Sequence, residues 1–253
     1  MKITFLGTGT SQGVPVIACN CKVCKSTDPR NKRTRASIKI EIKDKTFVID
    51  TGPDFRYQML KSNTQKLDAV LFTHEHKDHI AGLDDVRAFN YQTGLPMDIY
   101  ATQRVQEAIK RDFYYVFSGE GYPGIPELKL HTISNQPFSI NGIHFIPIEV
   151  LHYKLPVLGF RFEDVTYITD AKKIPKNEIE KIKGSKILIL NALRKEKHIS
   201  HLTLSEALDL AEEIKPEKTY LTHISHLMGM HNEVEKELPE NIFLSFDNLE
   251  INT

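Results

Sequence analysis

Four side chains that can bind metal stand close together in the stretch Phe72-Thr73-His74-Glu75-His76-Lys77-Asp78-His79. This stretch directly follows a run of apolar residues typical of a buried strand. On extended backbone, alternate side chains share a side, so His74 and His76 can converge on one ion. The turn beyond them can direct Asp78 and His79 toward a second ion. Imidazole and carboxylate ligands favour zinc, with manganese or iron as alternatives.

Three further candidate ligands, His152, Asp170 and His223, each follow an apolar run later in the chain. Each stands one or two residues beyond the end of a predicted strand. Folds that layer helices on strands place their chemistry at such strand ends. Together with the first four residues, these three would complete the shells of two catalytic divalent ions, zinc or manganese.

The three cysteines of the chain, Cys19, Cys21 and Cys24, fall within one six-residue stretch. No export signal accompanies them, so a disulfide framework is not expected. A tetrahedral structural zinc requires a fourth ligand, which must come from elsewhere in the chain. We expect His226 to supply it, because His226 lies three residues after His223 and one short segment could then serve both metal sites.

The order of these ligands resembles the pattern of the metallo-β-lactamase superfamily, His-x-His-x-Asp-His followed by His, Asp and His. The resemblance spans essentially the whole chain and implies a four-layer αβ/βα sandwich. It implies the following ligand groups: His74, His76 and His152 on one ion, Asp78, His79 and His223 on the other, and Asp170 bridging the two. It also implies that Asp50, in Ile49-Asp50-Thr51-Gly52, orients ligands without binding metal.

Two further stretches resemble the branch that contains the phosphoribosyl 1,2-cyclic phosphate phosphodiesterase. They are Leu6-Gly7-Thr8-Gly9-Thr10-Ser11-Gln12-Gly13-Val14-Pro15, which leads into the cysteines, and Asp50-Thr51-Gly52-Pro53-Asp54-Phe55-Arg56. This resemblance implies a structural zinc on the cysteines and His226, and it makes a homodimer the expected assembly. It also implies that His201, in Ser200-His201-Leu202-Thr203, protonates the leaving group.

The function expected from these residues is hydrolysis of a small cyclic phosphate or a nucleotide-like phosphodiester. Two cations can clamp the phosphoryl oxygens while a hydroxide attacks phosphorus. Asp78, which is also a ligand, and His201 are the predicted catalytic residues. Three alternatives remain: a ribonuclease Z-like enzyme that processes tRNA 3′ ends, a protein like pyrroloquinoline-quinone biosynthesis protein B, and a metal-binding module without catalysis.

Short β-branched runs alternate with helical patterns along the chain, which predicts an α/β fold. The sharpest helix signal is Thr203-Leu204-Ser205-Glu206, a capping box that begins a helix expected to end near Ile214. Strands are expected at 2–6, 37–42, 46–49, 69–72, 98–100, 144–150, 157–162, 166–168, 186–190 and 219–221, and further helices at 54–61, 102–111 and 175–182. The Gly- and aromatic-rich stretch 112–126 is expected to be an active-site loop.

Composition sets the remaining expectations. Lys plus Arg and Asp plus Glu both number 33, so no overall positive field draws in nucleic acid, and a small-molecule substrate is favoured. The start of the chain lacks a signal-peptide pattern and no segment is long and apolar enough to span a membrane, so a cytoplasmic location is expected. No linker divides residues 1–253, so we expect one domain. His131, His144, His198 and His231 are interpreted as ordinary surface or packing residues.

Overall fold

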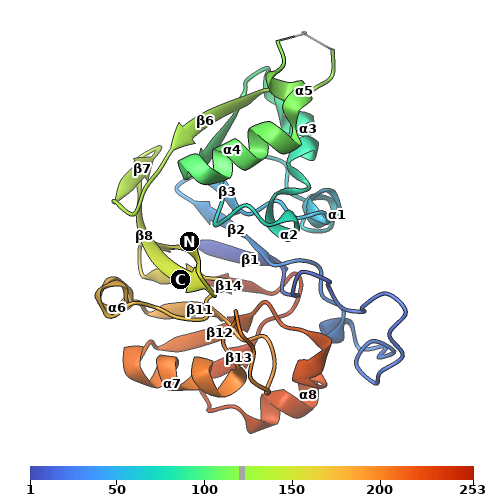
Figure 1. The fold of residues 1–253 in the computed structure, drawn as a ribbon, viewed down its shortest axis with the longest axis vertical. Helices are drawn as coiled ribbons and strands as arrows, with labels where there is room; N and C mark the ends of the chain where they lie inside the picture. Colours follow the sequence, from blue (N-terminus) through green and yellow to red (C-terminus); the bar gives the residue numbers. More distant parts are fainter. Residues whose placement is uncertain (120–122) are drawn as a thin grey trace. The chain divides into compact units, whose positions relative to one another are not determined.

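The computed structural model of the protein describes residues 1–119 and 123–253 (Figure 1). The chain forms two compact units. Unit 1 comprises Met1–Leu6, Ser37–Ser134 and Glu250–Thr253, and unit 2 comprises Gly7–Ala36 and Asn135–Leu249. Because each unit draws on separate stretches of the chain, the division does not fall at a single linker.

Unit 1 is built on a seven-stranded sheet in the order β14-β1-β2-β3-β4-β5-β6. Its strands are β1 (Lys2–Gly7), β2 (Ser37–Ile42), β3 (Lys45–Ile49), β4 (Ala69–Leu71), β5 (Met97–Ala101), β6 (Leu128–Thr132) and β14 (Glu250–Asn252). Strands β3 to β6 run parallel, whereas β2 pairs antiparallel with β3 and β1 antiparallel with β14. The carboxyl ends of the parallel strands therefore meet at one edge of this sheet.

Helices pack on the sheet of unit 1 through one apolar core. They are α1 (Phe55–Lys61), α2 (Lys77–Ile80), α3 (Arg87–Thr93), α4 (Gln103–Asp112) and α5 (Tyr114–Phe117), with a 3-10 turn η2 (Leu83–Val86). In α4 the Thr102 side chain caps the first turn by accepting from the Val105 N–H. Val105 and Ile109 then face the core at helical spacing and join Val70 and Ile99 from the strands.

Unit 2 contains the second sheet, also of seven strands, in the order β13-β12-β11-β10-β9-β8-β7. Its strands are β7 (Phe138–Ile140), β8 (Ile143–His152), β9 (Leu155–Phe162), β10 (Val165–Ile168), β11 (Ile187–Asn191), β12 (Lys218–Thr222) and β13 (Ile242–Leu244). Strands β10 to β13 are parallel and β7 to β10 antiparallel. The ends of β10 and β12 thus lie at the same edge of the sheet.

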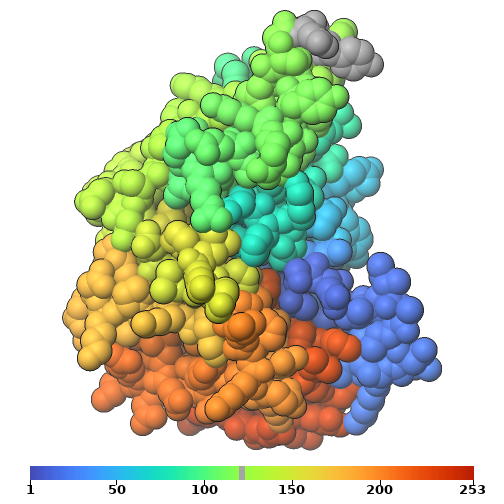
Figure 2. Space-filling view, viewed as in Figure 1, coloured from blue at the N-terminus to red at the C-terminus, as the bar shows by residue number. Residues whose placement is uncertain are grey.

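The helices of unit 2 are α6 (Lys176–Ile182), α7 (Leu204–Ile214) and α8 (His231–Val234), with 3-10 turns η1 (Pro29–Asn31), η3 (His226–Met228) and η4 (Glu235–Glu237). The predicted capping box of α7 is confirmed, with Thr203 and Glu206 each bonded to the other's backbone. Within this unit the N-terminal segment, blue in Figure 2, lies beside the red C-terminal part, and Lys22 pairs with Glu233 across that contact.

The α/β class is confirmed, and every strand and helix expected from the sequence is present within a few residues of its predicted bounds. Strands β6, β7, β13 and β14 were not predicted. In the stretch 112–126 the structure has the short helix α5, while residues 120–122 lie outside the described part of the chain. Across residues 1–119 and 123–253, no helix is long and apolar enough to cross a membrane.

Three of the residues expected near metal follow strands directly and have left-handed backbone. They are Asp50 after β3, Asp170 after β10 and His223 after β12, with φ of 66°, 55° and 56°. Side-chain-bearing residues adopt this conformation at a cost of about 1–2 kcal/mol. Such outliers gather at functional sites, where the surrounding structure imposes them.

Candidate metal centres

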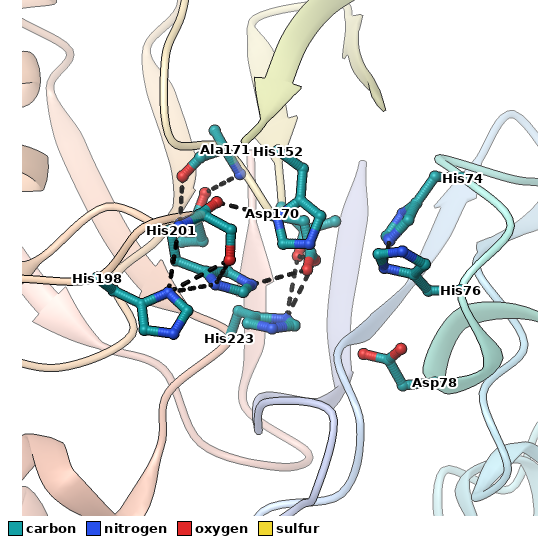
Figure 3. Close-up of polar contacts among 12 residues, drawn as sticks. His74, His76, Asp78, His152, Asp170, Ala171, His198, His201 and His223 are labelled. Carbon is teal, nitrogen blue, oxygen red and sulfur yellow. Dashed lines mark hydrogen bonds and ion pairs between the residues drawn. The ribbon is translucent and has the colours of Figure 1, made fainter. Parts of the chain in front are cut away.

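The histidine-rich stretch of unit 1 leaves β4 in extended form and turns into α2, which begins at Lys77. His74 and His79 are fully buried. The Nε2 atom of His74 lies 3.0 Å from Nδ1 of His76, and the two rings lie together in Figure 3. The Asp78 carboxylate is 3.2 Å from Nε2 of His79. The predicted neighbourhood of these four side chains within unit 1 is therefore observed.

Asp50 sits behind these histidines and is completely buried. Its Oδ2 atom is 2.7 Å from Nδ1 of His79 and accepts from the Thr73 hydroxyl at 2.8 Å, while Oδ1 accepts from the Thr73 N–H at 2.9 Å. Burial raises the pKa of the Asp50 carboxyl, and His79 and Thr73 oppose that shift. The expectation that Asp50 contacts ligands from behind is confirmed.

These contacts determine which nitrogen of each histidine faces away from Asp50. His79 donates from Nδ1 to Asp50, which leaves the Nε2 lone pair for a ligand. Thr73 donates its hydroxyl proton to Asp50, so its oxygen accepts from Nδ1 of His74 at 2.9 Å. One buried carboxylate thus sets the tautomer of two histidines, as outer groups do in metal sites.

The spacing of the donors fits a divalent ion. Two imidazole nitrogens bound to one tetrahedral zinc lie about 3.3 Å apart. The 3.0 Å between Nε2 of His74 and Nδ1 of His76 is close to that value. Nitrogen and carboxylate donors suit zinc or manganese alike, so the donor set is compatible with both ions.

In unit 2, the carboxylate of Asp170 lies among three histidines (Figure 3). Its Oδ1 atom is 3.0 Å from Nε2 of His201, and its Oδ2 atom is 3.2 Å from Nδ1 of His223. His152 completes the group, and one ligand atom each of His152, Asp170 and His201 lie within 4.8 Å of one another. Nδ1 of His152 donates to the Ser200 carbonyl at 2.9 Å, so Nε2 is the nitrogen available as a ligand.

Asn191, the last residue of β11, holds the backbone just beyond Asp170. Its side chain accepts from the Ala171 N–H at 2.8 Å and donates to the Ala171 carbonyl at 3.0 Å. The N–H of Leu202 donates to the same carbonyl, which ties the His201 loop to the end of β10. Asn191 and Thr73 were missed by sequence reasoning, because each acts on a ligand through a contact that no motif records.

His198 is also a neighbour of the site, although the sequence analysis grouped it with ordinary surface or packing residues. Its Nδ1 atom lies 3.1 Å from Nδ1 of His201, and Ser200 Oγ is within 3.0 Å and 3.3 Å of these two nitrogens. Burial and then the nearby His201 lower the pKa of His198. The only sequence signal was its spacing, three residues before His201.

The predicted cysteine site is observed in unit 2. Sγ of Cys19, Cys21 and Cys24 lies 3.4, 3.3 and 3.5 Å from Nδ1 of His226. One imidazole nitrogen cannot hydrogen-bond three thiols at once, because it offers a single proton or a single lone pair. Sulfur and nitrogen bound to one tetrahedral zinc are about 3.5 Å apart. The four donors therefore have the chemistry and the spacing of a structural zinc site.

The electrostatics of the thiols also call for a cation. The N–H of Cys24 and then His226 lower the pKa of Cys21 to about 6. Burial raises the pKa of Cys24 to about 11, and the neighbouring thiols add to that shift. Three thiolates so close together repel one another, and a divalent cation removes that repulsion by binding them.

Comparison with known proteins shows what this arrangement belongs to. A family model described as the Beta-lactamase superfamily domain matches residues 45–224. The crystal structure of a diphosphatase from the PhnP family aligns with a TM-score of 0.93 and 38% sequence identity, over 100% of this chain and 97% of that chain. The chain belongs to the PhnP family of the metallo-β-lactamase superfamily. The predicted superfamily, fold class and branch are thus confirmed.

Two curated relatives of this PhnP-family chain carry other names. An octanoyltransferase from Porphyromonas gingivalis is 41% identical over 254 residues, which cover 99% of this chain and 51% of that protein. A ribonuclease Z from an Exiguobacterium species is 25% identical over 167 residues, covering 64% of this chain and 49% of that protein. The chain thus spans about half the length of each of these relatives.

Proposed function

We propose that this PhnP-family chain is a metal-dependent phosphoric diester hydrolase. The observation that carries the proposal is the position of His201, a histidine that faces the metal-ligand candidate Asp170 at 3.0 Å. The similarity to a diphosphatase of the same family supports phosphorus as the reacting atom. A small cyclic phosphate or a nucleotide-like diester is the proposed substrate, because equal numbers of acidic and basic residues provide no general attraction for a nucleic acid.

The proposed ligands of two catalytic ions follow the order of the family's pattern along the chain. They are His74, His76, Asp78 and His79 from unit 1 and His152, Asp170 and His223 from unit 2. When bound, two divalent ions supply Lewis acidity toward phosphoryl oxygens and lower the pKa of water. A third ion, zinc, is proposed at Cys19, Cys21, Cys24 and His226, where it would stabilise the fold.

The chain's own residues supply orientation and a proton. Asp50 and Thr73 fix the tautomers of His74 and His79, so that ligand nitrogens are presented without reorganisation. His201 presents Nε2 toward Asp170, and the carboxylate favours a proton on that nitrogen. We assign to this proton the neutralisation of the leaving oxygen, the usual work of a general acid.

Octanoyl transfer is the second candidate, because the Porphyromonas gingivalis relative bears that name at 41% identity. The matched region is 51% of that protein, so the remainder is long enough to hold a separate domain. We propose that octanoyl transfer depends on that remainder. Ribonuclease Z activity is a weaker candidate, since the identity to that relative is 25%.

Assaying the zinc-loaded and manganese-loaded protein against substrates of each class separates these functions. The panel is bis(p-nitrophenyl) phosphate, a cyclic nucleotide, a dinucleoside diphosphate, a pre-tRNA, nitrocefin and an octanoyl thioester with an acceptor peptide. We expect turnover of the small phosphorus esters only, and its loss with a chelator. Octanoyl transfer or tRNA cleavage without diester hydrolysis would refute the proposal, and no turnover at all would favour a binding module.

The His201→Ala variant tests the proton donor. With p-nitrophenolate as the leaving group, which barely needs a proton, little activity should be lost. With an alkyl or ribosyl leaving group the loss should be about 10² to 10⁴-fold. Metal content should not change, and His144→Ala, at an exposed histidine of the same unit, is the matched control. Equal losses on both substrates, or loss of a metal equivalent, would make His201 a ligand or a positioning residue.

A further inference from the structure

His198, Ser200 and His201 form a closed triangle of polar contacts in the loop between β11 and α7 (Figure 3). The shortest edges are Nδ1 to Nδ1 between the two histidines, at 3.1 Å, and Ser200 Oγ to Nδ1 of His201, at 3.0 Å. Two nitrogen lone pairs at that separation would repel each other, so one hydrogen lies between the two rings. Only the question of which ring carries it remains.

The other end of His201 decides the question. Its Nε2 atom faces the Asp170 carboxylate at 3.0 Å, and an ionised carboxylate only accepts hydrogen bonds. Nε2 of His201 therefore bears a proton, and in the neutral ring Nδ1 is the acceptor. His198 must then donate from its own Nδ1. The Ser200 N–H lies 3.4 Å from that nitrogen, a longer contact than the one between the rings.

The loop around His198 is built to present this ring. The Arg194 guanidinium donates to the carbonyls of Glu196 at 3.3 Å and Lys197 at 2.8 Å, which fixes the backbone just before it. The His198 and His201 ring centroids are 5.0 Å apart. Partial burial and the neighbouring cationic groups keep His198 neutral, with a single N–H to give.

We propose that His198 is a positioning residue that holds His201 in the tautomer with its proton on Nε2. The catalytic consequence rests on the proposed function, in which His201 protonates the leaving oxygen. Without the donor at Nδ1, His201 can turn over or move its proton to Nδ1, and in either case the proton no longer points toward Asp170. Ser200 donates to the same nitrogen and would preserve part of the effect.

Two substitutions separate this role from simple packing. His198→Phe keeps a planar ring but removes the donor. His198→Asn places an amide N–H where Nδ1 of histidine was, so it should restore the contact. Histidine ¹⁵N chemical shifts of the zinc-loaded protein, recorded above the ordinary histidine pKa, distinguish protonated from bare ring nitrogens. The spectrum of His201→Ala identifies the His201 signals.

We expect His201 to bear its proton on Nε2 in the unsubstituted protein and in His198→Asn, and to populate both tautomers in His198→Phe. On a diester with an alkyl leaving group, His198→Phe should lose about tenfold in kcat, the size expected from one neutral hydrogen bond. On a p-nitrophenyl ester the loss should be small. In a His201→Ala background the same substitution should cause no further loss, because the two residues act as a unit.

A proton on Nδ1 of His201 in the unsubstituted protein would overturn the proposal, as would His198→Phe with unchanged ¹⁵N shifts. So would an equal loss in His198→Phe and His198→Asn. If the unsubstituted protein turned over no phosphodiester, the proposed function would fail while the ¹⁵N spectra still decided the role of His198. Zinc content and melting temperature serve as controls in every variant.

Discussion

Replacing Asp50 with Ala should destabilise the fold and weaken metal binding together. The substitution removes the acceptor of two buried donors, the Thr73 N–H at 2.9 Å and Nδ1 of His79 at 2.7 Å. Each buried donor left without a partner costs about 1–3 kcal/mol. Alanine is also less tolerant than aspartate of φ 66°, which adds about 1 kcal/mol. The total is about 3–7 kcal/mol, a large part of the 5–15 kcal/mol typical of a folded protein.

The assay is thermal unfolding of the metal-free protein with a zinc titration alongside. In a protein of this length, each 1 kcal/mol shifts the melting temperature by about 2–4 °C, so Asp50→Ala should melt about 6–28 °C lower. Zinc affinity should fall about 10–100-fold, because His79 loses the group that orients it. Asp50→Asn keeps one acceptor oxygen and tolerates the backbone, so it should lose about 1–3 kcal/mol.

Asp44→Ala is the matched control, since Asp44 is an exposed aspartate of the same unit with φ 61°. It reports the backbone cost without the buried hydrogen bonds. If Asp50→Ala melted within about 2 °C of Asp44→Ala, or bound zinc as the unsubstituted protein does, the assignment of Asp50 as the group behind the histidines would be refuted.

Three further predictions concern other parts of the chain. Cys21→Ser should lower the zinc content by about one equivalent and reduce thermal stability, measured by elemental analysis and unfolding, and unchanged zinc would contradict the structural site. Burial lowers the pKa of His231 to about 4 from its ordinary value of 6.5. Stability should therefore be lost as the pH falls from 6.5 to 4, by at most about 1.4 kcal/mol per pH unit, and His231→Gln should flatten that part of the profile unless another group causes it. Gly82→Ala would place a methyl group 2.1 Å from the Gly52 carbonyl, so it should unfold far more readily than Gly142→Ala, whose methyl meets nothing within 4 Å, and equal melting temperatures would count against this packing.

The sequence predicted those features whose signal is local. The ligands His74, His76, Asp78 and His79 stand together in the chain, and the capping box of α7 occupies four consecutive residues. The cysteine site needed one distant ligand, and the spacing from His223 to His226 was enough to identify it. By contrast, β7, β13 and β14 have three residues each, too few for a periodic pattern to show.

The parts of the site that sequence reasoning missed depend on contacts between distant residues. Thr73 gains its role only because β3 and β4 pair in parallel, which brings Asp50 beside it. Asn191 is likewise an unremarkable strand residue until β10 and β11 align. His198 belongs to no motif, and its importance follows from a loop conformation that places its Nδ1 atom on His201.

The left-handed backbone at Asp50, Asp170 and His223 limits which amino acids each position can accept, independently of metal binding. Glycine adopts this conformation without strain and asparagine with little, whereas valine, isoleucine and threonine meet steric conflict at their branched carbon. In a saturation library, variants that lose the ligand yet keep the chain foldable should therefore be enriched in Gly and Asn at these positions. An alanine scan would instead mix the loss of a ligand with backbone strain and overstate what the metal contributes to stability.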